Sequence, residues 1–360
     1  MINQAKIKNI KISSSATIQD ALKQMDREDR KLLIVSKNDN FRSLISIGDI
    51  QRAILNDKPL NTHISEILRK EIKVVHPEDN YFKIKELMKN YRMEFIPVIG
   101  SNNNLEEVIF WEDLIDDDEK HFISKLNIPV IIMAGGKGTR LKPITNIIPK
   151  PLIPIGEKPI VEWIINSFNK VGVQNFYLTV NYKKEMIKGY FDHIQKDYDL
   201  QYFVEDKPLG TAGSLHLLKM EIDSTFFVTN CDILIKDDYF EMLKYHKENG
   251  NELTAVCAVK HFEVPYGTME FKENGILTAL KEKPNFNMFI NAGMYILEPH
   301  LLDEIPENEF FHITTLMEKI MERKGKVGVF PVSEGSWMDV GQWDEYNKTS
   351  KRLGYDGINI

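Results

Sequence analysis

The sequence predicts an α/β protein in two parts: a repeated α+β module at residues 1–120 and a mostly parallel sheet at residues 128–360. Two observations carry this prediction. The first part shows the order helix, strand, strand, helix twice, roughly sixty residues apart. The second part alternates apolar runs with helix-like stretches, which is typical of parallel strands covered by helices. A charge run, DDDEK at 116–120, separates the parts, and residues 121–127 are expected to form a linker.

Composition limits the class of protein. The 360 residues are 42% apolar and 28% charged, the balance of a globular protein with two or three domains. The net charge of −7 argues against a nucleic-acid-binding surface. We find no apolar run near the ~20 residues of a transmembrane helix, and no signal peptide. Two cysteines are too few for a disulfide framework, so we expect a cytoplasmic protein without a membrane partner.

The two repeats are expected at residues 1–60 and 61–120. In the first, Thr17 and Asp20 predict a capped helix start, followed by the strands KLLIVS and SLISIG. In the second, a helix reaching Met88 precedes the strands FIPVIG and EEVIFW. A unit of this size buries its apolar face poorly alone, so the two copies should pack against each other.

The repeats resemble a pair of CBS domains, on the strength of SIGD at 46–49 and IPV at 96–98. The resemblance implies an adenine nucleotide as ligand, with Ser46 at a phosphate and Asp49 at the ribose. Asp113 takes the matching place in the second copy. Both aspartates fit equally well as helix N-caps. The pair would be a regulatory module or a dimerisation surface, and we therefore expect a homo-oligomer.

In the second part, seven apolar runs are candidate strands: PVIIMA, NFYLTV, LQYFVE, TFFVTN, ELTAVCAV, FINAGMYIL and KVGVFPV. Helix-like stretches lie between them, for example at 160–170, 183–197 and 211–220. Ligands of such sheets bind at the carboxyl ends of the strands. The residues that follow each strand are therefore the first candidates for a site.

The sharpest motif, AGGKGTRL at 134–141, follows the first of these strands. Its glycines let the backbone bend tightly and bring N–H groups close to phosphate oxygens. Its spacing fits neither a Walker A loop nor a dinucleotide-binding fingerprint. Lys150, held between two prolines, is suited to deliver charge to a phosphate. The residues predicted to bind the phosphates are Ala134, Gly135, Gly136, Gly138, Thr139 and Arg140.

The string GGKGTRLKPITNIIPKPLIPIGEKPI closely resembles the signature of sugar-1-phosphate nucleotidylyltransferases, and the resemblance continues through residue 360. It implies a Rossmann-like domain in which a sugar 1-phosphate attacks the α-phosphorus of a nucleoside triphosphate and pyrophosphate leaves. It implies Mg²⁺ on Asp232 and Asp339, with Arg140 on the triphosphate and Lys150 and Lys283 neutralising charge. The attacking phosphate is already an anion, so no catalytic base is needed.

The same resemblance assigns a sugar pocket. Glu282 matches a residue that contacts sugar hydroxyls, and Lys283 matches one that contacts the sugar phosphate. Gly267, Asn291 and Gly293 match further segments of that pocket.

Base choice is expected around Glu205 and LGTAG at 209–213, where Gly210 should let a flat base approach and Thr211 should bind the nucleotide. Guanine shows two adjacent donors on its Watson–Crick edge, and a carboxylate accepts both. This favours GTP. Uridylyl, thymidylyl and cytidylyl transfer remain alternatives, as does a simple ion pair of Glu205 with Lys207.

The sugar is expected to be glucosamine 1-phosphate. Guanylyltransferases with a short C-terminal end and a CBS pair resemble the glucosamine-1-phosphate guanylyltransferases of bacterial legionaminic acid synthesis. Mannose, glucose and heptose phosphates are alternatives. A second class, a nucleotide sensor with an inactive transferase-like domain, is disfavoured because Arg140, Lys150, Asp232 and Asp339 are all present.

Overall fold

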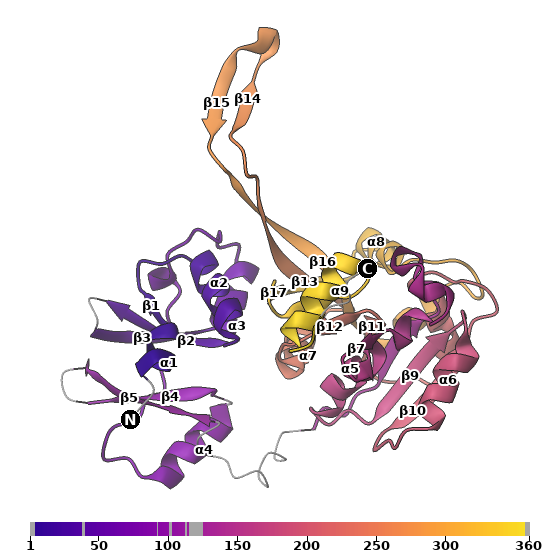
Figure 1. Cartoon of the computed structure of the whole chain (residues 1–360), viewed down its shortest axis with the longest axis horizontal. Coiled ribbons are helices and arrows are strands. Elements are labelled where there is room, and N and C mark those ends of the chain that lie inside the picture. Colours follow the sequence, from indigo (N-terminus) through magenta and orange to yellow (C-terminus); the bar gives the residue numbers. More distant parts are fainter. Residues whose placement is uncertain are drawn as a thin grey trace. The chain divides into compact units, whose positions relative to one another are not determined.

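The computed structural model describes residues 4–37, 40–91, 93–100, 103–111, 114 and 125–356. The chain divides into two units, each described by itself (Figure 1). The first comprises residues 1–122, 259–288 and 333–335, and the second comprises residues 123–258, 289–332 and 336–360. Asp113, the DDDEK run and the first part of the expected linker lie outside the described residues.

The first repeat forms a three-stranded sheet in which β1 is parallel and β3 antiparallel to β2. Its elements are α1 (Gln4–Asn9), β1 (Lys11–Ser13), α2 (Ile18–Glu28), β2 (Leu32–Lys37), β3 (Asn40–Ser46) and α3 (Ile47–Leu55). The predicted capping box is confirmed: the Thr17 hydroxyl accepts the Asp20 N–H, and the Asp20 carboxylate accepts the Thr17 N–H.

The second repeat follows the same plan over its described residues. It consists of α4 (Tyr81–Tyr91) and the antiparallel pair β4 (Phe95–Ile99) and β5 (Leu105–Phe110). Phe95 and Phe110 are buried in the same core as Leu33 and Ile45 of the first repeat. The Arg30 guanidinium also lies 5.2 Å from the centre of the Phe110 ring. The two copies therefore share a core, as predicted.

The second unit is built on a seven-stranded sheet in the order β10-β9-β6-β11-β16-β13-β17. Neighbouring strands from β10 to β11 are parallel, and β16 is antiparallel to β11. All seven predicted runs form this sheet, which confirms the mostly parallel α/β class. The strands are β6 (Val130–Ala134), β9 (Asn175–Val180), β10 (Asp199–Val204), β11 (Phe226–Asn230), β13 (Leu253–Glu263), β16 (Asn285–Leu297) and β17 (Val327–Ser333).

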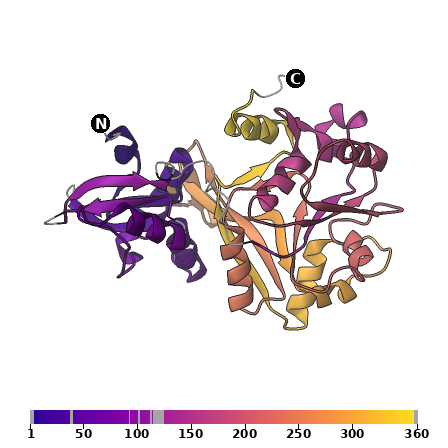
Figure 2. The same cartoon turned by 90° about the horizontal axis from the view of Figure 1, so that it is seen from below.

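Helices cover both faces of this sheet (Figure 2). Side chains alternate along β6, so that Val130 and Ile132 belong to one core, whereas Ile131 and Met133 belong to the other. Strands buried on both faces are continuously apolar, which is why they were recognisable. The first core includes α5 (Ile160–Asn169), α6 (Lys184–Asp192), α7 (Tyr239–Glu248) and α9 (Trp343–Arg352), and the second includes η8 (Gly213–Leu218), η10 (Pro299–Glu304) and α8 (Ile313–Glu322).

Two predicted helices are shorter than expected. The stretch 183–197 is helical only over α6, and 211–220 contains only the 3₁₀ helix η8. The reason at the second position is a competing interaction. The N–H groups of Ala212 and Gly213 donate to the carbonyl of Phe311, at 3.0 and 3.1 Å, and thus fix the chain in a non-helical course.

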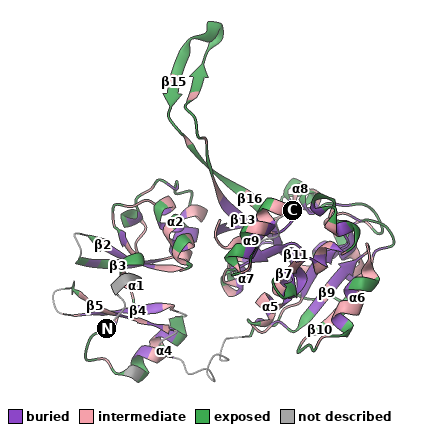
Figure 3. Cartoon of the chain, in the orientation of Figure 1, coloured by how far each residue is buried: buried purple, intermediate pink, exposed green. Residues whose placement is uncertain are grey.

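The hairpin of β14 (Thr268–Phe271) and β15 (Leu277–Lys281) was not predicted. It lies between β13 and β16 in the sequence and is largely exposed (Figure 3). Its large apolar residues are more than half exposed, so no burial pattern marks it as a pair of strands; Met269, Phe271, Leu277 and Leu280 are 56–73% exposed. None of the described helices is long and apolar enough to cross a membrane.

Candidate active site in the second unit

A cavity of about 360 Å³ lies where the parallel strands β6 and β11 end. The glycine loop leaves β6 at this edge, and Asp232 follows β11, which is the edge where α/β sheets bind ligands. Its walls are Met133, Gly135, Gly136, Gly138, Arg140, Lys150, Glu205, Pro208, Leu209, Gly210, Thr211, Asn230, Cys231, Asp232, Phe310 and His312.

The glycines of the loop have different physical roles. A Cβ at Gly135 would lie 2.3 Å from a carboxylate oxygen of Glu205, so glycine is needed for that close approach. Gly138 has φ +63° and packs against Lys150. Gly136 faces open space. The loop is thus bent toward the cavity as expected.

Two of the residues predicted to bind phosphate, Ala134 and Thr139, are not among the described residues that line the cavity. Ala134 is 1% exposed and belongs to the hydrophobic core. Thr139 begins the short 3₁₀ helix η5 (Thr139–Leu141) and is not among the described lining residues. Arg140, in the middle of η5, does line the cavity.

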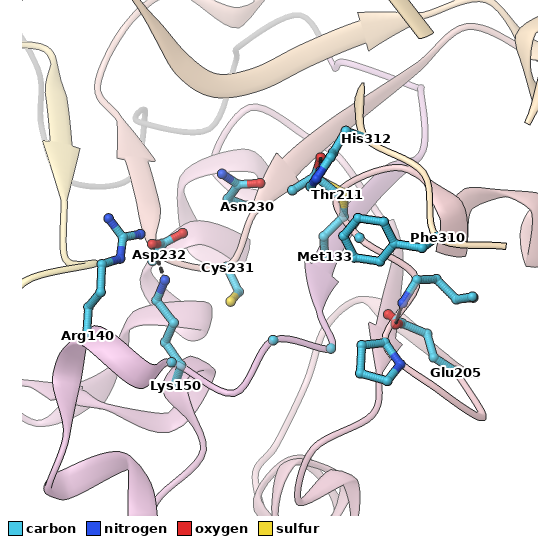
Figure 4. A pocket seen from close by; sticks show the side chains of 16 residues that line it. Met133, Arg140, Lys150, Glu205, Thr211, Asn230, Cys231, Asp232, Phe310 and His312 are labelled. Carbon is cyan, nitrogen blue, oxygen red and sulfur yellow. Dashed lines mark hydrogen bonds and ion pairs between the residues drawn. The ribbon is translucent and has the colours of Figure 1, made fainter. Parts of the chain in front are cut away.

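One end of the cavity is charged (Figure 4). The Lys150 ammonium forms an ion pair with the Asp232 carboxylate, and both side chains are nearly buried. Burial is the largest single influence and lowers the pKa of Lys150, but the charge and hydrogen bond of Asp232, together with Cys231, hold this pKa above its ordinary value. Lys150 therefore carries its charge at neutral pH.

A short antiparallel pairing brings the two predicted metal ligands together. Strand β12 (Ile233–Ile235) pairs with β18 (Trp337–Asp339), and Ile233 lies opposite Asp339. A Cβ at Gly341 would lie 2.8 Å from an oxygen of Asp232 and 2.9 Å from an oxygen of Asp339. The two carboxylates therefore face the same small space, and glycine keeps it open.

These two carboxylates fit a magnesium ion. Burial and the neighbouring Asp232 carboxylate raise the pKa of Asp339, while the Gly341 N–H, Lys150 and Arg140 act in the opposite direction. The described residues contain no group of three or more metal-ligating side chains. Mg²⁺ is ordinarily held by one or two carboxylates together with substrate phosphates, so this pair suffices.

The opposite end of the cavity contains Glu205, which is 5% exposed. Its carboxylate accepts the N–H of Leu209 at 3.2 Å. Burial raises its pKa, while this N–H and the hydroxyls of Thr179 and Ser214 act in the opposite direction. The Glu205 carboxylate is therefore held in place by Leu209, Thr179 and Ser214, and it lines the cavity.

Gly210 lines the cavity, and its backbone also has a packing role that the sequence analysis did not anticipate. Gly210 has φ +83°, and a Cβ there would lie 2.6 Å from the Phe311 carbonyl oxygen. A Cβ at Gly213 would lie 2.5 Å from the carbonyl oxygen of Glu309. Both glycines thus allow the segment 309–311 to pack closely, and the approach of a flat base to Gly210 stays a prediction.

Phe310 and His312 line this end of the cavity and were missed by the sequence analysis. They precede α8, about a hundred positions along the chain from Thr211, so no local spacing connects them to LGTAG. The sequence signal was the adjacent pair Phe310-Phe311 before a helix. Only one of two adjacent rings is expected to pack in the core, so the other is available for another contact.

The predicted sugar residues fall into two groups. Asn291 and Gly293 lie on β16 in the second unit, where Asn291 accepts from the Gly293 N–H and the Tyr295 hydroxyl. A Cβ at Gly293 would lie 2.6 Å from the side chain of Asn230, a cavity residue. Gly293 therefore packs against a wall residue, but neither Asn291 nor Gly293 is among the described lining residues, and their sugar-binding role stays a prediction.

The second group belongs to the first unit and is not placed relative to the cavity. Gly267 and Glu282 are neighbours, since a Cβ at 267 would lie 2.9 Å from the Glu282 carboxylate. Lys283 has φ +41°, in the left-handed region. Their sugar-binding role stays a prediction.

In the N-terminal repeats, Ser46 and Asp49 form a second capping box. One Asp49 oxygen accepts the N–H and hydroxyl of Ser46, and the other is paired with Arg52 and Arg69. The N-cap interpretation is therefore corrected: Ser46 is the N-cap of α3, and Asp49, the third residue of the helix, accepts the backbone N–H of that cap. An adenine nucleotide at this position stays a prediction.

Comparison with known proteins identifies the family. The family model for nucleotidyl transferases matches residues 129–354, and the CBS domain model matches residues 6–56 and 64–119. The chain belongs to the nucleotidyl transferase family and carries a CBS pair at its N-terminal end.

Individual relatives give more detail. A mannose-1-phosphate guanyltransferase of Emericella nidulans is 34% identical over 227 residues, covering 59% of this chain and 60% of the relative. One of Saccharomyces cerevisiae is 35% identical over 228 residues, covering 59% and 61%. The chain thus spans about 60% of the length of these curated relatives. The crystal structure of HddC from Yersinia pseudotuberculosis matches at 25% identity and TM-score 0.50, covering 63% of this chain and 99% of that chain.

The packing at Gly210 can be tested by its effect on stability. Gly210→Ala should lower the free energy of unfolding by about 1–3 kcal/mol, because φ is positive and the Phe311 carbonyl fills the space. Gly189→Ala is the control. It lies inside α6 with nothing within 4 Å, so it should stabilise by up to about 1 kcal/mol. Thermal unfolding midpoints measure both, and shifts of equal sign would contradict the packing argument.

Proposed function

We propose that this protein transfers a nucleoside monophosphate from a nucleoside triphosphate to a sugar 1-phosphate, with release of pyrophosphate. One observation supports this most: a single cavity at the sheet edge combines the glycine loop, Arg140 and Lys150 with Asp232, beside Asp339. A nucleotide sensor would need the phosphate-binding groups but not a pair of carboxylates beside them.

In the proposed reaction an oxygen of the sugar phosphate attacks the α-phosphorus in line, and pyrophosphate leaves. The protein's residues act by positioning and charge. Arg140 and the loop amides would hold the triphosphate, and Lys150 would neutralise charge that develops on the phosphates. Magnesium, held by Asp232 and Asp339, would supply further stabilisation of phosphate charge when bound.

GTP is the proposed nucleotide. Glu205 lines the end of the cavity opposite Lys150 and Asp232, where a base would lie when the phosphates occupy the charged end. Its carboxylate could accept the two adjacent donors of guanine. The names of the relatives from Emericella nidulans and Saccharomyces cerevisiae also support guanylyl transfer.

For the sugar, the relatives' names favour mannose 1-phosphate over the glucosamine 1-phosphate expected from the sequence. Glucosamine 1-phosphate, and with it legionaminic acid synthesis, stays a prediction. A cytoplasmic location, a homo-oligomer and a regulatory adenine nucleotide at the CBS pair are likewise predictions.

A pyrophosphate-release assay with Mg²⁺ tests the proposal. GTP, UTP, dTTP, CTP and ATP are each combined with mannose, glucosamine, glucose and heptose 1-phosphates. We expect turnover with GTP and fastest reaction with mannose 1-phosphate. Fastest reaction with glucosamine 1-phosphate would restore the sequence-based expectation. Absence of turnover with every pair would contradict the enzyme proposal and favour the sensor.

The role of Asp232 predicts a large loss of activity on neutralisation. Asp232→Asn removes a metal-binding charge and the partner of Lys150, so turnover should fall by at least about 10³-fold. Asp303→Asn is the control, since Asp303 is exposed and paired only with surface Lys219. Both variants are checked for an unchanged circular dichroism spectrum. Mg²⁺-dependent turnover near that of the wild type in Asp232→Asn would refute the assignment.

The role of Glu205 predicts a change in base preference. Glu205→Gln keeps the shape of the side chain but turns one acceptor into a donor, which opposes the guanine edge. We expect the ratio of kcat/KM for GTP to that for UTP to fall about 10-fold or more. An unchanged ratio would show that Glu205 only supports Leu209 and does not read the base.

A further inference from the structure

We propose that the ring of Phe310 forms the wall against which the base of the nucleotide stacks. Phe310 would then be a binding residue for the nucleoside triphosphate. The inference rests on the proposed function, because it requires a base at the end of the cavity opposite the charged groups.

The two ends of the cavity differ in chemistry (Figure 4). Arg140, Lys150 and Asp232 gather at one end, which suits phosphates and a cation. The other end presents Phe310, Pro208 and Leu209 around the carboxylate of Glu205. A nucleotide with its phosphates at the charged end would extend its base toward this apolar end.

The Phe310 ring is exposed, yet its backbone is fixed. Phe310 is 61% exposed, whereas Phe311 beside it is only 7% exposed and packs in the second core. The Phe311 N–H donates to the Leu209 carbonyl at 2.9 Å, and the Phe311 carbonyl accepts the N–H groups of Ala212 and Gly213. Phe311 is thus fixed in the core by these backbone bonds, while the Phe310 ring lines the cavity.

His312 restrains the ring from the other side. The two ring centroids are 4.8 Å apart with an interplanar angle of 84°, an edge-to-face contact. The His312 ring is itself 3.3 Å from the Thr211 hydroxyl, which accepts the N–H of Ile313. Phe310 therefore has little freedom to lose on binding, which favours affinity.

A single exposed apolar residue is ordinary on a protein surface and carries no argument by itself. Phe310 differs because it lines the cavity, contacts the His312 ring and lies at the same end as the buried carboxylate of Glu205. The two contacts would divide the recognition of the base. Phe310 would cover its face, which every base has, and Glu205 would read its edge.

The test compares Phe310→Ala, Phe310→Leu and Phe310→Tyr with the wild type. Calorimetric titration with GTP, without sugar phosphate, gives Kd, and the pyrophosphate assay gives KM and kcat. Stacking predicts a Kd about 5- to 100-fold higher for Phe310→Ala, a similar rise in KM and an almost unchanged kcat. Phe310→Tyr should bind like the wild type, and Phe310→Leu should resemble Phe310→Ala. Phe82→Ala, which removes a ring that is 74% exposed in the first unit, is the control.

Two results would overturn the inference: a Kd for Phe310→Ala within twofold of the wild type for every nucleotide, or wild-type affinity in Phe310→Leu. Because Phe310 is exposed, its variants should keep the wild-type unfolding midpoint, so a change in Kd reports on the cavity. Nucleotide binding that depends on Phe310 without any turnover would refute the proposed function and leave this inference standing.

Discussion

The pairing of β12 with β18 is the constraint on which the candidate site depends. It places Asp339 opposite Ile233, and the Val340 N–H donates to the Asp232 carbonyl at 3.0 Å. The two carboxylates come from distant parts of the chain and repel each other. Backbone hydrogen bonds and the burial of Met338 offset that repulsion, so the fold holds together two charges that would otherwise separate.

Lys150 balances part of this charge. Its side chain is 13% exposed and that of Asp232 8%, so neither ion could remain there without a partner. The lysine is carried on η7 (Lys150–Leu152), which begins after Pro149 and packs beside Gly138 of the glycine loop. The glycine loop, the lysine and the carboxylates are thus one connected structure, and a change in one of them affects the others.

The sequence predicted those parts whose signal is local. Seven apolar runs were sufficient to identify the sheet, because strands buried on both faces require apolar side chains throughout. The capping box at Thr17 and the glycine loop could also be predicted from the sequence, since each is a short motif with a fixed geometry. The hairpin β14–β15 was missed because most of its residues, including its large apolar ones, are exposed, so neither alternation nor a buried run marks it.

Contacts between segments far apart in the sequence could not be predicted from local patterns. Gly210 is a clear case: its positive φ could be anticipated from LGTAG, but not that the Phe311 carbonyl would occupy the space above it. Phe310 and His312 line the cavity because the segment 309–311 packs against residues 209–213. The CBS resemblance, by contrast, placed Asp49 correctly in a strand-to-helix turn. An aspartate at this position suits both the stabilisation of a helix start and the binding of a nucleotide. The sequence alone therefore cannot distinguish these two roles.

The charged end and the apolar end of the cavity are formed by different segments of the chain, which bears on nucleotide specificity. The charged end stands on η5, η7 and the residues after β11, whereas Phe310 and His312 stand on the segment before α8. Substitutions in that segment can alter how the face of a base is covered while the charged groups keep their positions. Because only interactions that strengthen in the transition state accelerate the reaction, the apolar end would mainly set affinity and the charged end the rate. The backbone bonds between Phe311 and residues 209–213 hold the apolar end without any contribution from the charged groups.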